Sequence, residues 1–280
     1  MKTVKRAIIF FLLLFVTCAT WGWFSIWRSP KHFTLTQECP DNQSILTMPQ
    51  YGALVDTHAR PFVVTSPELT VFGAEHTRDP NDSQIEHIQT EWERLEPTVA
   101  LVEGRLGFLI PYAMNPVERF GESGAVAALA KSDGADLYSW ELPRSDLITE
   151  LLKSFTAEQV ALHQILTPYF SGYRFGPPKD PVEFVESFIH RAQYPGLDNC
   201  ITSIEDIDRI WVRDFADDKD WPEVSDQFGL PGYLAQISDE ANLIRNRHLV
   251  CAIEELLTHG ERVLVICGSS HAVCIEPAFR

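Results

Sequence analysis

Short apolar runs alternate with amphipathic segments along most of the chain. Four of these runs are rich in β-branched and aromatic residues and have the length of buried strands, at residues 69–74, 99–102, 137–140 and 263–267. Segments with helical periodicity lie between them. This alternation predicts a parallel or mixed sheet covered by helices on both faces, which is an α/β fold.

The helical segments carry recognisable start signals. Asp82 or Ser83 can cap a helix whose apolar face is made of Ile85, Ile88, Trp92 and Leu95. Further helices are predicted for an Ala-rich stretch at residues 124–130, from Asp180-Pro181 onward, and over the amphipathic residues 238–259. The middle of the chain is therefore mostly helical, with breaks at Pro and Gly.

The N-terminus has the pattern of a membrane anchor. A 21-residue run without charge covers residues 7–27, follows three cations and contains a cluster of three tryptophans near its end. This length suits a membrane span better than the shorter core of a cleaved signal peptide, although cleavage near Ala19 is the alternative. We expect the N-terminus to lie inside and the domain outside the cytoplasmic membrane.

These patterns divide the chain into an anchor or signal, a linker, and one α/β domain with a helical cap. The predicted bounds are residues 1–28 for the anchor, 29–60 for the linker and 61–280 for the domain, with the cap at 143–233.

Composition limits the partners of this domain. The formal net charge is −16, although the first three cations all precede the apolar run. A domain this acidic repels phosphate backbones and anionic lipid surfaces. We therefore expect no nucleic-acid partner, and contact with the membrane only through the N-terminal segment.

Six cysteines do not form a disulfide scaffold in a chain of this length, and no CxxC is present to indicate structural zinc. Cys39 and Cys200 lie in loop-like sequence and could pair. Cys251, Cys267 and Cys274 are predicted to be buried thiols.

Four ionisable residues occupy equivalent positions in the predicted sheet. His76 and His271 follow the first and last strands, and Glu103 and Glu141 end the two between them. Ligands of open α/β sheets bind at the carboxyl ends of strands, where these side chains are expected to converge. Each residue alone is more often a hydrogen-bonded loop histidine or a solvated glutamate, but four at equivalent ends favour a site. Together they could hold a divalent metal or perform acid–base chemistry without one.

A nucleophile elbow is the alternative interpretation of Gly121-Glu-Ser-Gly-Ala125. That motif needs a strand directly before it, and residues 115–120 do not have a strand pattern. Ser123 is instead predicted to cap the Ala-rich helix.

The two GxxH motifs, Gly73-Ala-Glu-His76 and Gly268-Ser-Ser-His271, together with Glu103-Gly104, resemble those of the TraB/GumN/Tiki family. Further pieces that resemble this family are Gly121-Glu122 before the Ala-rich helix, Glu141-Leu-Pro-Arg144 with Ile148-Thr149, and Arg245-Asn246 before the last strand. They cover about residues 69–150 and 238–274. The first motif departs from the common Gly-Thr-x-His form, and the cap region matches nothing in the family.

The resemblance implies a duplicated α/β core and, from the Tiki branch, a metal-dependent peptidase. Related erythromycin-esterase-like enzymes imply hydrolysis without a metal, and other branches imply regulatory roles. We expect a hydrolase of peptide or small-molecule substrates whose divalent metal is held by His76, Glu103 and His271, with Glu141 or Glu122 as the fourth ligand. Glu75 or Glu122 would then take the proton of a water, and Arg245 would neutralise a developing oxyanion. The alternatives are a metal-free hydrolase and a binding module without turnover.

Overall fold

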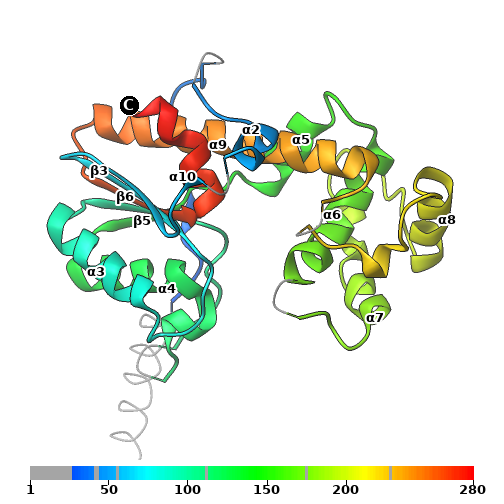
Figure 1. Ribbon diagram of the computed structural model, residues 1–280, viewed down its shortest axis with the longest axis horizontal. Coiled ribbons are helices and arrows are strands. Elements are labelled where there is room, and N and C mark those ends of the chain that lie inside the picture. The colour runs from blue at the N-terminus through cyan, green and yellow to red at the C-terminus, as the bar shows by residue number, and fades with distance from the viewer. Residues whose placement is uncertain (1–26, 41–43, 55–56, 111–112, 174–175, 227–228) are drawn as a thin grey trace, which may run out of the picture. The chain divides into compact units, whose positions relative to one another are not determined.

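The computed structural model describes residues 27–40, 44–54, 57–110, 113–173, 176–226 and 229–280. The chain forms two compact units, shown in Figure 1. The first is built from residues up to 38, 56–141 and 251–276, and the second from residues 39–55, 142–250 and 277–280.

The first unit contains a six-stranded mixed sheet. Its strands are β1 (Lys31–His32), β2 (Phe62–Thr65), β3 (Leu69–Ala74), β4 (Val99–Val102), β5 (Asp136–Ser139) and β6 (Val263–Gly268). They pair in the order β1-β5-β4-β6-β3-β2, and every neighbouring pair is parallel except β2 with β3. The predicted α/β fold with a mixed central sheet is therefore confirmed.

The parallel pairing brings four strand ends to one edge of the sheet. Because β3, β6, β4 and β5 are consecutive neighbours that run in the same direction, their carboxyl ends lie side by side. Ala74, Gly268, Val102 and Ser139 end these strands. Loops that leave this edge can therefore carry side chains into a common region.

Helices cover both faces of this sheet (Figure 1). On one face, α3 (Ser83–Leu95) and α4 (Pro116–Asp133) pack against alternate strand residues. The apolar core between these helices and the sheet includes Phe72, Ile88, Trp92, Ala100, Val102, Val126, Ala127, Leu264 and Ile266. On the other face, α10 (Ser269–Ile275) lies against β3, so close that a Cβ on Gly73 would come within 2.5 Å of the Ala272 Cβ. Glycine at position 73 is therefore what lets this short helix seat on the sheet.

The second unit is helical. It contains α2 (Met48–Gly52), α5 (Arg144–Leu151), α6 (Ala157–Gly172), α7 (Pro181–Glu186), η3 (Ile189–Gln193), α8 (Ile204–Asp214), η4 (Trp221–Glu223) and most of α9 (Gly232–Thr258), whose end belongs to the first unit. Its own core is rich in aromatic residues, among them Tyr169, Phe170, Trp211, Phe215 and Trp221. The prediction of a mostly helical middle region is confirmed at the level of secondary structure.

Most predicted elements are confirmed, with corrections at their starts. The four predicted strands are present, α3 is capped by Asp82, and α7 begins at Pro181. The helix expected at residues 124–130 instead begins at Pro116, capped by Asn115, because the non-helical Gly121 interrupts its pattern. Ser123 therefore lies inside α4 and does not cap it.

Two strands were missing from the prediction. The segment expected to be a linker supplies β1, which pairs with β5, and β2 forms an antiparallel border strand at the other side of the sheet. Two to four residues are too few to establish a periodicity, so their pairing comes from the tertiary fold.

The predicted anchor at residues 7–27 lies outside the described residues, apart from Trp27. Among the helices of the described ranges, none combines the length and the apolar character needed to cross a bilayer.

The cysteine predictions are corrected in two places. Cys39 and Cys251 are disulfide-bonded, whereas Cys200, Cys267 and Cys274 are free thiols. The pairing of Cys39 with Cys200 and the buried thiol at Cys251 were therefore wrong. A disulfide requires two Cα atoms within about 7 Å, and linear spacing does not encode that proximity.

Candidate functional site

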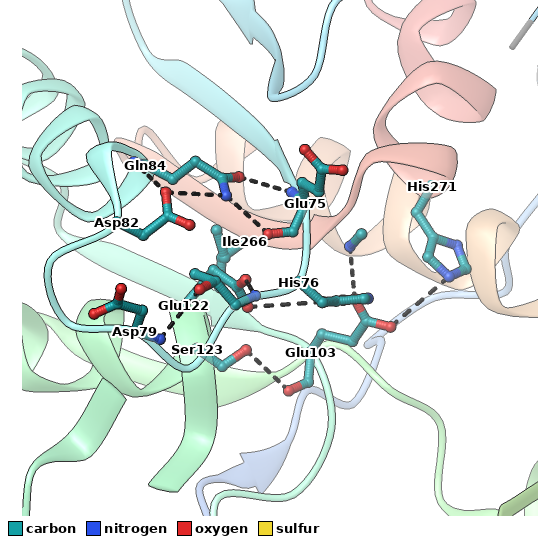
Figure 2. A network of polar contacts seen from close by, with 12 residues as sticks. Glu75, His76, Asp79, Asp82, Gln84, Glu103, Glu122, Ser123, Ile266 and His271 are labelled. Carbon is teal, nitrogen blue, oxygen red and sulfur yellow. Dashed lines mark hydrogen bonds and ion pairs between the residues drawn. The ribbon is translucent and has the colours of Figure 1, made fainter. Parts of the chain in front are cut away.

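Two histidine–carboxylate pairs lie beside the carboxyl edge of the sheet (Figure 2). His76 comes from the loop after β3, Glu103 directly follows β4, and His271 lies in α10 after β6. Glu122 comes from α4 and is the fourth member. We call these four residues the His–Glu cluster.

Glu122 holds the loop that carries His76. One of its carboxylate oxygens accepts a hydrogen bond from the Thr77 backbone N–H, and the other lies 3.7 Å from His76 Nδ1. Glu122 is itself buried. A carboxylate held in this way fixes the orientation of the imidazole ring and directs Nε2 away from itself.

Gly121 makes this contact possible through its backbone. It has φ 58° and ψ −144°, a conformation close to glycine-only, in the middle of α4. A Cβ at this position would lie 2.8 Å from the Thr77 carbonyl oxygen. Gly121 therefore leaves room for the Thr77 carbonyl, and Glu122 accepts a hydrogen bond from the Thr77 N–H.

Replacing Gly121 with alanine is expected to lower the free energy of unfolding by about 1–3 kcal/mol, because the backbone conformation is strained for any other residue. The matched control is Gly134→Ala, since Gly134 also has a positive φ (75°) but meets nothing within 4 Å. Denaturant melts of both variants should show the larger loss for Gly121→Ala. Equal losses would mean that neither the ψ of −144° nor the close approach of Thr77 adds to the cost that a positive φ imposes at both positions.

Glu103 connects β4 to β6 and to His271. Its Oε2 accepts a hydrogen bond of 2.7 Å from the Gly268 backbone N–H, and its Oε1 lies 3.8 Å from His271 Nε2. Its backbone carbonyl accepts a bond from the Ser123 hydroxyl. The carboxylate is therefore fixed from two sides, as Figure 2 shows.

Gly268 brings the two pairs together. A Cβ placed on Gly268 would lie 3.2 Å from His76 Nε2 and 3.8 Å from Glu103 Oε2. His76 Nε2 and the Glu103 carboxylate thus border the same small space, which any larger residue at position 268 would fill.

The two pairs share a gradient of exposure. The side chains of His76 and Glu103 are 41% and 22% exposed, whereas those of Glu122 and His271 are each 8% exposed. Each pair therefore has one member that solvent or a substrate can reach and one inner member that orients it.

The sequence Gly-Ser-Ser-His is typical of a surface turn, but His271 lies in a helix. It is buried in the first turns of α10, and its ring meets that of Trp140 edge to face, with 5.3 Å between the centroids. Trp140 in turn donates a hydrogen bond to the Ile266 carbonyl. Loss of the His271 side chain is therefore expected to lower stability, because removing it leaves a cavity beside a buried tryptophan.

Three other predicted site residues are not members of the His–Glu cluster. Glu75 is exposed and contributes its backbone, which exchanges two hydrogen bonds with the Gln84 amide, while Figure 2 shows its carboxylate directed away from His76. Glu141 follows β5 at the same sheet edge, where its backbone carbonyl lies 2.6 Å from His32 Nδ1. Arg245 belongs to the second unit and donates to Asn242 one turn earlier in α9.

Gln84 was not predicted from the sequence. It is buried at the start of α3, and its amide bonds both backbone groups of Glu75. Its own backbone N–H donates a hydrogen bond to the carboxylate of Asp82, which caps the helix. That N–H bond lowers the pKa of Asp82 below its usual value, which keeps the cap ionised. A buried glutamine three residues into a predicted amphipathic helix was the available signal, because buried amides are almost always hydrogen-bonded.

Imidazole and carboxylate groups are suitable ligands for divalent cations. Within the described ranges, however, no group of three or more His, Cys, Asp or Glu side chains is arranged to hold a metal ion. The four residues predicted as ligands thus do not form a preassembled shell. His76 Nε2 and Glu103 are the two donors that face the same space beside Gly268.

Comparisons with known proteins add no assignment. No family model matches the chain, and no significant match occurs among curated proteins or among solved structures.

Proposed function

We propose that this chain is a membrane-anchored hydrolase whose active site is the His–Glu cluster. The observation that carries the proposal is the convergence of His76 Nε2 and the Glu103 carboxylate beside Gly268, each oriented by a buried partner. This is the arrangement that activation of a water by a general base requires.

The residues suggest distinct roles. A water between His76 Nε2 and Glu103 would give its proton to His76 while its oxygen attacks a carbonyl carbon. Glu122 would stabilise the imidazolium that forms at His76, and His76 would then return the proton to the leaving group. Glu103 would accept a hydrogen bond from the other O–H of the water, which stays on the attacking oxygen, and so orient the lone pair of that oxygen toward the carbonyl carbon. We assign the base role to His76 because Glu122 is engaged by Thr77 and Glu75 is directed away.

The substrate class we propose is an amide or ester of a peptide or small molecule. It follows from the resemblance to TraB/GumN/Tiki proteins and to erythromycin-esterase-like enzymes, which differ in their need for a metal. If the enzyme binds a divalent cation, the side chains of His76, Glu103 and His271, with Glu141 or Glu122, would have to rearrange to hold it, and the cation would supply Lewis acidity. We also propose a duplicated α/β core and a helical cap. Arg245 would neutralise the developing oxyanion.

We place the domain outside the cytoplasmic membrane. The apolar residues 7–27 and the cations before them support this orientation. The disulfide-bonded state of Cys39 and Cys251 also supports it, because such bonds persist in oxidising compartments.

The test is hydrolysis by the full-length protein in detergent against panels of peptides and esters, with elemental analysis of the same sample. Activity that survives chelation supports the His76 mechanism, and activity lost with a bound metal and restored by it supports the metal-dependent alternative. A folded protein that binds panel members without cleaving any of them would indicate the non-catalytic module instead.

A further inference from the structure

Two large apolar side chains are exposed next to the point where the predicted anchor joins the first unit. Phe108 is 55% exposed and Ile110 is 43% exposed, while Leu109 between them is buried. In the described part of the chain, the only other large apolar residues that are exposed are Val182 and Val212, which lie in the second unit. Phe108 and Ile110 thus form the exposed apolar pair of the first unit.

The start of the described chain is held against this pair. The Trp27 N–H donates a hydrogen bond of 2.9 Å to the Leu109 carbonyl in an antiparallel bridge, and the Ser29 hydroxyl bonds the Leu106 carbonyl. Alternate residues of an extended segment point to opposite sides. Leu109 and its bridge partner Trp27, whose side chain packs against the core of the first unit, therefore face one side, and Phe108 and Ile110 face outward on the other.

Trp27 is also the last residue of the uncharged run at 7–27. If that run spans the bilayer, as proposed above, Trp27 lies at the membrane–water interface, where tryptophan is favoured. The hydrogen bond to Leu109 then places Phe108 and Ile110 at the same depth or close to it.

Each of the two paired segments carries an exposed cation, Arg28 in one and Arg105 in the other. Cations beside exposed apolar side chains match the interface of a bilayer that contains anionic lipid.

From this juxtaposition we propose that residues 105–110 form a second membrane contact, in which Phe108 and Ile110 insert into the interfacial layer beside the anchor. Insertion of about 5–10 Å is typical of such side chains. The contact fixes the orientation of the first unit on the membrane, which attachment at a single point would not do. It rests on the proposed anchor and departs from the expectation that only the N-terminal segment touches lipid.

The test uses full-length protein in phosphatidylcholine vesicles that contain a minority of phosphatidylglycerol. Cys18→Ser and Cys200→Ser remove thiols that would compete for label, since Cys267 and Cys274 are buried. An environment-sensitive fluorophore is attached at Phe108→Cys or Ile110→Cys. Thr65→Cys, on exposed β2 at the opposite border of the sheet, is the control in the same unit, and Val212→Cys is the apolar control.

We expect a blue shift and several-fold stronger quenching by nitroxide lipids at positions 108 and 110 than at position 65 or 212. Quenching no greater than at Thr65→Cys would overturn the proposal, as would a label that is shielded from aqueous quencher but untouched by lipid quencher, because protein would then cover it. A label at Val16→Cys reports the anchor separately. Deep quenching there without quenching at 108 would leave the anchor intact and reject the second contact.

Discussion

Replacing His76 with alanine is expected to lower kcat/KM by about 10²–10⁴-fold, the range typical for loss of a general base. The reason is geometric: His76 Nε2 borders the space beside Gly268, and its Nδ1 lies 3.7 Å from a buried carboxylate. The measurement is the rate on any panel substrate that the wild-type protein cleaves. Stability should change little, because the His76 side chain is 41% exposed.

The matched control for this variant is His87→Ala. His87 lies on α3 of the same unit and is 44% exposed, and it also has a glutamate partner, Glu91, at 4.0 Å. Its loss should leave activity unchanged. A His76→Ala enzyme that retains wild-type rates would remove His76 from the mechanism, and partial rescue of the variant by added imidazole would support its role as base.

A variant of Glu122 can distinguish a role in positioning and charging His76 from a purely structural role. Glu122→Gln keeps an acceptor for the Thr77 N–H but removes the negative charge beside His76. The acidic limb of the pH–rate profile, which reports ionisation of His76, should therefore move to lower pH, because loss of a nearby carboxylate disfavours the imidazolium. A purely structural Glu122 would lower stability without moving the pH profile.

Much of the fold could be predicted because its signals are local. Apolar β-rich runs of four to six residues mark β3, β4 and β6 within a residue of their bounds, and Asp82 marks the start of α3. The parallel arrangement then followed from the alternation of strands and helices. β1 and β2 carry no such signal, since they are strands only through their partners β5 and β3.

The site was partly predictable for the same reason. Positions after strands placed His76, Glu103 and His271 near one sheet edge, and the topology of the sheet supplies that proximity. What the sequence does not encode is the direction of a side chain after the strand ends. Glu75 and His76 are adjacent in the sequence, yet one points away and the other faces Glu103.

Burial was the property that sequence reasoning misjudged. His271 follows a strand in a small, polar segment that is typical of an exposed turn, but the chain enters α10 at once and carries the ring under Trp140. Glu122 likewise sits on a helix that is buried over most of its middle. Both outcomes depend on α10 and α4 seating against the sheet, which is a tertiary event.

Lowering the pH from about 6.5 to about 4 is expected to destabilise the second unit by about 3 kcal/mol through His163 alone. His163 lies on α6 and is buried, and this burial lowers the pKa of its imidazole to about 4 from the ordinary value of 6.5. Between these two values the unfolded chain binds a proton that the folded unit does not. The contribution is therefore fully present above pH 6.5 and is lost as the pH falls through 4.

His163→Leu should flatten this pH dependence, since leucine has no proton to bind. The exposed His190 of the same unit is the control, and His190→Ala should keep the wild-type slope. The measurement is a series of denaturant melts between pH 4 and 7, followed by tryptophan fluorescence, to which Trp211 and Trp221 of this core contribute. If wild type and His163→Leu lose stability in parallel as the pH falls, the acid sensitivity arises elsewhere. The constant difference in stability between the two proteins would then report packing alone, because a volume change is independent of proton binding.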